Sequence, residues 1–162
     1  MGEEDSLVHY YASLATKRMG AGLVCRDAVG RVLLVQPTYK PTWEIPGGVV
    51  ELDESPATAV ARECREELGI SLPIGRLLVV DWIPARHPKT EGLMLLFDGG
   101  VLDEPVVQQI SLPVDELRDW AFVHPNEIGE YASENLARRL QAALVALDSG
   151  EPRYLERGRS LE

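Results

Sequence analysis

The stretch from residue 48 to residue 70, GVVELDESPATAVARECREELGI, most constrains how this 162-residue chain can fold. Ser55 and Pro56 form a helix-start signature, because a serine side chain caps free backbone N–H groups and proline suits the first turn. No glycine or proline follows until Gly69, which is placed to end the helix as a left-handed residue. The sequence therefore predicts a single helix that ends at Leu68.

Two faces of this helix carry different residues. One face is apolar at spacings of three and four and suits a core: Ala57, Val60, Ala61, Cys64 and Leu68. On another face Glu63, Glu66 and Glu67 fall together, because residues three and four apart are neighbours on a helix. Arg62 lies one turn before Glu66 and can pair with it. The acidic face is either a solvated surface, salt-bridged by Arg62 and Arg65, or a site for a hard dication, which prefers carboxylate oxygens.

The fixed residues of this stretch resemble the Nudix box, G-x5-E-x7-R-E-U-x-E-E-x-G-U, where U is a bulky apolar residue. Counting from Gly48, every fixed position is filled: Glu54, Arg62, Glu63, Glu66, Glu67 and Gly69. The U positions hold Cys64 and Ile70, and Cys64 is a mild departure because a free cysteine behaves as a small hydrophobe. The segment before the box, WEIPGG, also looks like the family's usual lead-in. This resemblance covers about residues 18 to 147.

The resemblance implies metal-assisted cleavage of a diphosphate. In the Nudix family the box forms a loop–helix–loop that holds magnesium or manganese ions, which neutralise charge on the diphosphate and activate water. By that analogy Glu63 and Glu67 are the primary metal ligands, and Glu66 is a further ligand or the catalytic base. The carbonyl of Gly47 often completes the metal shell in relatives. The expected cofactor is therefore Mg²⁺ or Mn²⁺.

The same resemblance gives Glu54 and Arg62 a structural role, as a pair that fixes the loop against the helix. It leaves the general base open, because some relatives use a glutamate of the box and others a carboxylate on a distant loop. The candidates outside the box are Glu91, Asp103, Glu104 and Glu116. Each of these is otherwise an ordinary surface acid.

The expected substrate is a nucleoside diphosphate linked to a second moiety X, of the nucleotide, nucleotide sugar or ADP-ribose class. Tyr39 and Trp82 are candidates to stack on a base, and Lys40 is the nearest cation for a phosphate. Each is otherwise a residue of the core or the rim. His124 and Asn126 precede the last predicted helix, where some relatives read the base.

Two other functions compete with this one. The first is an isopentenyl diphosphate isomerase on the same scaffold. The chemistry of such an enzyme resembles a proton shuttle that uses a cysteine and a glutamate outside the box. Neither Cys25 nor Cys64 is expected in a pocket, because both lie in apolar patterns. A Nudix-like nucleotide-binding sensor without turnover often lacks a box glutamate or carries a DNA-binding domain, whereas this box is intact and the length suits one domain.

Composition narrows the partners and the compartment. The net charge is −10 and no cluster of Lys and Arg appears, which argues against long nucleic acid as a partner. There is no long apolar run, so no membrane span is expected, and the first residues lack the basic start and apolar stretch of a signal peptide. Two cysteines without a disulfide framework fit a reducing cytoplasm. The sequence therefore predicts a cytoplasmic protein that acts on a small molecule.

Strand-like and helical segments alternate along the chain. The predicted strands are Ala21–Arg26, Arg31–Gln36, Arg76–Ile83, Leu93–Phe97 and a possible short one at Gln109–Pro113. Val114–Trp120 is predicted as a short helical turn, and Ser133 as the cap of a last helix that runs to Leu147. Strands interrupted by two main helices favour an α+β fold, and the resemblance implies an α/β/α sandwich with a mixed β-sheet.

Three segments are expected. Residues 1–17 form an N-terminal extension, in which Leu7, Tyr10, Tyr11 and Leu14 could make an amphipathic helix or an added strand. In several relatives this region helps to form a dimer, so a homodimer is an expected assembly. Residues 18–148 form the Nudix-like domain, and residues 149–162 are predicted as a polar tail. The last helix is expected to pack its leucines inward, with Arg138 and Arg139 outside.

Overall fold

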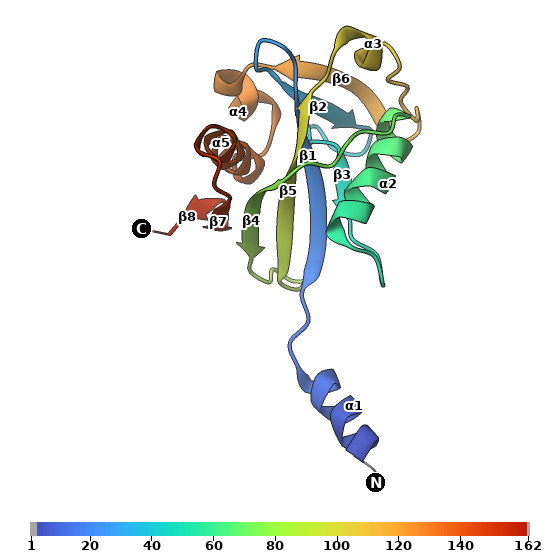
Figure 1. Ribbon diagram of the computed structural model, residues 1–162, viewed down its shortest axis with the longest axis vertical. Helices are drawn as coiled ribbons and strands as arrows, with labels where there is room; N and C mark the ends of the chain where they lie inside the picture. The colour runs from blue at the N-terminus through green and yellow to red at the C-terminus, as the bar shows by residue number, and fades with distance from the viewer. Residues whose placement is uncertain (1–2, 162) are drawn as a thin grey trace.

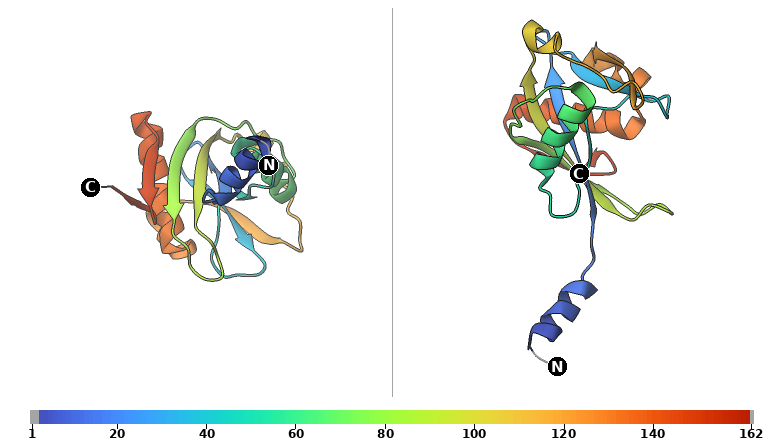
Figure 2. Two further views of the ribbon diagram at one scale, coloured as in Figure 1. Left: turned by 90° about the horizontal axis from the view of Figure 1, so that it is seen from below. Right: turned by 90° about the vertical axis from the view of Figure 1, so that its right-hand side faces the viewer.

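A mixed, eight-stranded sheet lies between helices on its two faces in the computed structural model, which describes residues 3–161 (Figures 1 and 2). The strand order is β6-β2-β1-β5-β4-β7-β8, and β3 also pairs with β1. The strands are β1 (Arg18–Arg26), β2 (Val32–Pro37), β3 (Gly47–Val49), β4 (Leu77–Ile83), β5 (Gly92–Val101), β6 (Leu117–Val123), β7 (Arg153–Glu156) and β8 (Arg159–Ser160). The helices are α1 (Glu3–Ser13), α2 (Pro56–Leu68), α3 (Glu104–Val107), 3₁₀-helix η1 (Pro125–Glu127), α4 (Ile128–Tyr131) and α5 (Glu134–Ser149).

The two faces of the sheet carry separate cores. Val24, Leu34 and Leu96 pack with Leu136 and Leu140 of α5 on one face. On the opposite face, side chains of β1 and β2 pack against α2, at Ala21, Leu23, Cys25, Leu33, Val60 and Cys64. Because β1 and β5 run parallel while β1 and β2 run antiparallel, the sheet is mixed. The predicted α+β sandwich with a mixed sheet is therefore confirmed.

The four longer predicted strands correspond to β1, β2, β4 and β5, but two local predictions are wrong. Residues 109–113, predicted as a short strand, form a turn and loop after α3. Residues 114–120, predicted as a helical turn, form a three-residue turn and then β6. β6 pairs antiparallel with β2, with Leu34 opposite Ala121. This pairing satisfies backbone groups along β2, which a short helix here would leave without partners.

Residues 149–162 are predicted as a polar tail, but within them residues 153–160 add a β-hairpin to the sheet. β7 pairs parallel with β4, and Leu155 is only 1% exposed in the core. The backbone N–H of Gly158 donates to the buried carboxylate of Asp81, 2.9 Å away. The same carboxylate accepts from the guanidinium of Arg139, which is buried and not outside as predicted. Arg139 can face inward because Asp81 compensates its charge.

The helix α1 lies apart from the rest of the protein (Figures 1 and 2). Of the two predicted conformations for this segment, the structure has the helix and not the strand. The side chains from Glu4 to Ser13 are exposed, including the apolar ones of Leu7, Tyr10 and Tyr11. The expected role of this region in a dimer stays a prediction.

Both cysteines are free and fully buried, as the sequence predicts. Burial raises the pKa of the Cys64 thiol to about 12 and that of Cys25 still further. Both thiols are therefore protonated and unreactive at neutral pH.

Within residues 3–161, no helix is both long enough and apolar enough to cross a bilayer.

The buried pair of Asp81 and Arg139 predicts a large effect on stability. Asp81→Ala should lower the free energy of unfolding by about 3–5 kcal/mol, because it leaves an uncompensated guanidinium in the core. Urea denaturation followed by fluorescence measures this change. As a control, Glu134→Gln removes one partner of the exposed Glu134–Arg138 pair and should cost below about 1 kcal/mol. Equal small losses in both variants would contradict the role of the buried pair.

Candidate functional site

The helix α2 begins and ends where the sequence predicts. The side chain of Ser55 accepts from the N–H of Thr58, and Pro56 is the first helical residue. Gly69 ends the helix in the left-handed conformation at φ 70°, with its N–H bonded to the carbonyl of Arg65. These caps fix which turn of α2 lies over β3, and so they fix where its glutamates point.

Arg62 ties the loop before α2 to the helix. Its Nε and Nη2 donate to the two carboxylate oxygens of Glu54 at 3.0 Å each, which is a bidentate pair. Nη2 also donates to the carbonyl of Val49 at 3.1 Å, and Nη1 to Glu63 at 2.8 Å and Glu66 at 3.2 Å. The guanidinium lowers the pKa of Glu54, and the carboxylates raise the pKa of Arg62. Glu54 and Arg62 thus form the pair expected from the sequence.

Glu67 is the most perturbed carboxyl group of the site. Burial raises its pKa to about 7, and the nearby carboxylates of Glu63, Glu116 and Glu44 add to this effect. A hydrogen bond from the N–H of Gly47, 2.9 Å from Glu67 Oε2, opposes the shift. An ionised Glu67 therefore lacks a compensating cation in this arrangement, which is the electrostatic condition that favours a bound dication.

Two glycines of β3 let the carboxylates approach the sheet. A β-carbon on Gly47 would lie 2.2 Å from the carbonyl oxygen of Ala21, and its φ of 141° is rarely adopted by other residues. A β-carbon on Gly48 would lie 2.4 Å from Glu63 Oε1. The residue type at both positions is therefore fixed by contacts between β1, β3 and α2.

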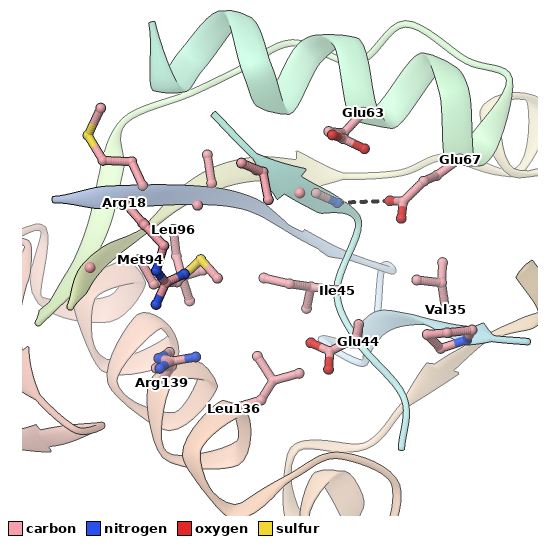
Figure 3. Close-up of a pocket in the computed structure, with 18 of the residues that line it drawn as sticks. Arg18, Val35, Glu44, Ile45, Glu63, Glu67, Met94, Leu96, Leu136 and Arg139 are labelled. Atoms are coloured by element: carbon pink, nitrogen blue, oxygen red, sulfur yellow. Dashed lines mark hydrogen bonds between the residues drawn. The ribbon is translucent and has the colours of Figure 1, made fainter. Parts of the chain in front are cut away.

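The glutamates of α2 open onto a cavity of about 580 Å³ (Figure 3). Four carboxylates line one part of it, here called the acidic end: Glu44, Glu63, Glu67 and Glu116. Three cations line another part, here called the basic end: Arg18, Lys89 and Arg139. Apolar side chains lie between them: Ile45, Met94, Leu96 and Leu136. Glu66 does not line the cavity, and its side chain is 56% exposed beside Arg62.

The other predicted substrate residues divide into two groups. Tyr39 and Lys40 line the cavity, and Lys40 forms an ion pair with Glu44. Trp82 does not line it, and its indole N–H donates at 3.1 Å to Glu91, in the loop before β5. His124 and Asn126 lie outside the cavity lining as well, where the His124 ring caps η1.

Only one of the base candidates outside the box lines the cavity, among the described residues, and it is Glu116. Glu91 pairs with Lys17 and with the indole of Trp82. Asp103 caps α3, and Glu104 bonds the side chain of Gln108. Asp103 and Glu104 are thus held at α3 by local contacts, whereas Glu91 is held in part by Lys17, 74 residues away in the sequence.

Sequence reasoning did not find Glu44, Arg18, Lys89 or Arg139 as cavity residues. The position of Glu44, three residues before the glycine pair, was the one available signal, because the lead-in segment must pass beside the box. The three cations come from β1, the turn between β4 and β5, and α5. Only the folded sheet brings these segments together.

The donor atoms of this site fit a hard dication. Glu63 and Glu67 present carboxylate oxygens to the cavity, and burial, with added repulsion from Glu63, raises the pKa of Glu67. Within residues 3–161, no three side chains of His, Cys, Asp or Glu are already grouped as a metal-binding cluster. Glu63 is held by Arg62, and Glu67 by the N–H of Gly47. A dication would therefore compete with these two donors.

Comparison with known proteins gives consistent matches. The family model of the NUDIX domain matches residues 16–144. A MutT-like protein of Streptomyces ambofaciens is 36% identical over 137 residues, which are 82% of this chain and 77% of that protein. A solved UDP-X diphosphatase superposes with a TM-score of 0.73 at 19% identity and covers 96% of this chain and 76% of its own. The MutT protein of Methanosarcina mazei Go1 superposes with a TM-score of 0.63 at 23% identity, over 85% and 98% of the two chains. These two structures share the fold.

The close contact at Gly47 predicts a loss of stability. Gly47→Ala should lower the free energy of unfolding by about 2 kcal/mol, because it adds strain at positive φ and a clash with the Ala21 carbonyl. The melting temperature should fall by about 4–8 °C, measured by calorimetry. Gly129→Ala is the matched control, because no atom lies within 4 Å of that position. A fall of the same size in both variants would contradict the steric argument.

The raised pKa of Glu67 predicts how stability depends on pH once divalent ions are chelated. The folded protein holds this proton up to about pH 7 and the unfolded chain only to about 4.5. Its stabilising contribution is thus fully present below pH 4.5 and is lost as the pH rises through 7, on the order of 3 kcal/mol. Urea denaturation at pH 5, 6, 7 and 8 measures the slope. Glu67→Gln should remove most of it; an unchanged slope in this variant would refute the assignment.

Proposed function

Because this chain belongs to the Nudix family of hydrolases, which act on phosphorus-containing acid anhydrides, we propose that it is a divalent-metal-dependent pyrophosphohydrolase. The proposed substrate is a nucleoside diphosphate linked to X, cut into a nucleoside monophosphate and phosphate-X. The observation that carries this proposal is the approach of Glu63 and Glu67 to one cavity, where burial and repulsion raise the pKa of Glu67.

Nudix hydrolases generally use divalent metal ions. We propose Mg²⁺ or Mn²⁺ here, held by Glu63 and Glu67, with Glu66 and the carbonyl of Gly47 as further ligands. When bound, the ion neutralises charge that grows on the diphosphate oxygens and acidifies the attacking water. Arg62 supports this site because it fixes Glu63 and the loop that carries Glu54.

Two glutamates remain as candidates for the base that takes the proton of the attacking water. Glu116 lines the cavity and follows a turn at Pro113, so it can face the substrate. Glu66 is the box candidate, and it lies beside Arg62 outside the cavity lining. The geometry supports Glu116, since a base must come within hydrogen-bond reach of the water that it activates.

The cavity supports a small-molecule substrate. Its volume of about 580 Å³ lies in the range of ligand pockets. Tyr39 is 78% exposed among the cavity-lining residues, so it could stack on a base, and Lys40 beside it could contact a phosphate. The net charge of −10 argues against long nucleic acid, and the two free thiols agree with a reducing cytoplasm. A homodimer through α1 remains part of the proposal.

Neither competing function gains support from the site. The isomerase needs a cysteine at the substrate, but Cys25 and Cys64 are fully buried and absent from the cavity lining. A sensor without turnover would bind the same ligands through the same carboxylates. Turnover therefore separates the sensor from the enzyme.

Mutation of Glu67 tests the proposed reaction. With Mg²⁺ and a panel of dNTPs, ADP-ribose, nucleotide sugars and dinucleoside polyphosphates, Glu67→Gln should lower kcat at least ~100-fold, because the metal loses a primary ligand. Phosphate release measured by a colorimetric assay gives the rates, and calorimetry with Mg²⁺ should show weaker uptake. Glu130→Gln, an exposed acid outside the cavity lining, is the matched control. Turnover of Glu67→Gln at the wild-type rate would remove the metal role.

A further inference from the structure

The basic end of the cavity has no part in the proposed metal chemistry. Lys89 lies on the turn between β4 and β5, and its ammonium makes no ion pair or side-chain hydrogen bond among the described residues. Arg18 donates only to the carbonyl of Thr90, at 2.9 and 2.6 Å, so a neutral oxygen orients it and no acid neutralises it. Two cations therefore face the cavity without a bound carboxylate.

Arg139 adds a third, buried donor to the basic end. Its residue is 9% exposed, and its Nε is bonded to Asp81. Its Nη1 and Nη2 atoms make no hydrogen bond among the described residues. Both atoms keep some accessible surface, so they are not fully buried. Since Arg139 lines the cavity, these terminal N–H groups are directed to its interior. In Figure 3 the side chains of Arg18 and Arg139 lie on the same side of the view as Met94, away from Glu63 and Glu67.

The acidic and basic ends of the cavity lie at different positions along β1. In β1, Ala21 pairs with Gly48, the glycine that contacts Glu63, and Arg18 lies three residues earlier opposite Gly92. At roughly 3.3 Å per residue this is about 10 Å along the strand. The bond to Thr90 keeps the Arg18 guanidinium at its own end. A diphosphate at the acidic end therefore leaves the basic end for a different anion.

The surface between the two ends is apolar. Gly20 lacks a side chain, and a β-carbon there would lie 3.0 Å from the terminal methyl carbon of Met94. Leu96 and Leu136 line the same region, and Ile45 lies between the two ends in Figure 3. Such a surface suits an uncharged organic group, for example a sugar or a base.

Resting on the proposed pyrophosphohydrolase activity, we propose that the preferred substrate carries a further phosphate monoester on the organic part of the molecule, and that the basic end binds it. Arginine and lysine side chains suit this group, since guanidinium donors match phosphate oxygens and an ammonium adds a point charge. The diphosphate lies at the acidic end, the organic group on the apolar surface, and the phosphate monoester among Arg18, Lys89 and Arg139.

Matched substrates that differ by one phosphate test this proposal. NADP and NAD form one pair, and coenzyme A and 3′-dephospho-coenzyme A form another; all four contain a diphosphate. The phosphorylated member should have a kcat/KM at least ~10-fold higher, as expected for one charge-assisted hydrogen bond of ordinary strength. Equal values within each pair would overturn the proposal and leave the pyrophosphohydrolase activity standing.

Lys89→Met tests the basic end without disturbing the core, because Lys89 is exposed. It should lower kcat/KM on the phosphorylated substrates ~10-fold and leave the others within about twofold. Arg86→Met is the matched control, since Arg86 lies on the same turn and does not line the cavity. If Lys89→Met slowed both members of a pair equally, the basic end would bind the scissile diphosphate, and the proposal would fail.

A binding measurement separates this proposal from the reaction itself. In EDTA, calorimetry should show tighter binding of adenosine 2′,5′-bisphosphate than of AMP, and Lys89→Met should abolish that preference. If none of the four diphosphates is hydrolysed, the proposed function fails on these substrates, while the binding preference still decides whether the basic end recognises the extra phosphate. Equal binding of both nucleotides would refute it.

Discussion

A single guanidinium, that of Arg62, holds the acidic helix face and its preceding loop in one arrangement. It reaches five acceptor atoms on two segments: both oxygens of Glu54, the carbonyl of Val49, and one carboxylate oxygen each of Glu63 and Glu66. The repulsion among neighbouring glutamates is thereby partly compensated. Glu67, one turn further along α2, has no such cation, and so the uncompensated charge of the helix is concentrated where the cavity begins.

The absence of side chains at two positions of β3 lets that charge reach the cavity. Gly47 and Gly48 bring the backbone of β3 against β1 on one side and under α2 on the other. A side chain at either glycine would separate these elements, and the N–H of Gly47 could then no longer reach Glu67. The caps at Ser55 and Gly69 fix where α2 begins and ends, and so they fix which residues of α2 lie over β3. The geometry of the carboxylates is thus a property of backbone packing as much as of the acids.

The parts of this protein that could be predicted from sequence are those whose signals are local. Helix α2, its caps and the Glu54–Arg62 pair depend on residues within one short stretch, and spacing alone indicates them. The larger failures depend on distant partners. Asp81 and Arg139 are 58 residues apart, and the hairpin that buries Leu155 pairs with β4 across the whole second half of the chain. A polar composition gave no sign of that pairing.

The C-terminal hairpin connects this long-range packing to the cavity. Gly158 donates to Asp81, Asp81 accepts from Arg139, and the remaining N–H groups of Arg139 face the cavity. A buried ion pair is weak as a source of stability, because apolar residues of similar volume often hold a core equally well. An apolar pair, however, would place no oriented guanidinium at the cavity. The last strands of the chain therefore orient a cation at the basic end, although they lie outside the cavity themselves.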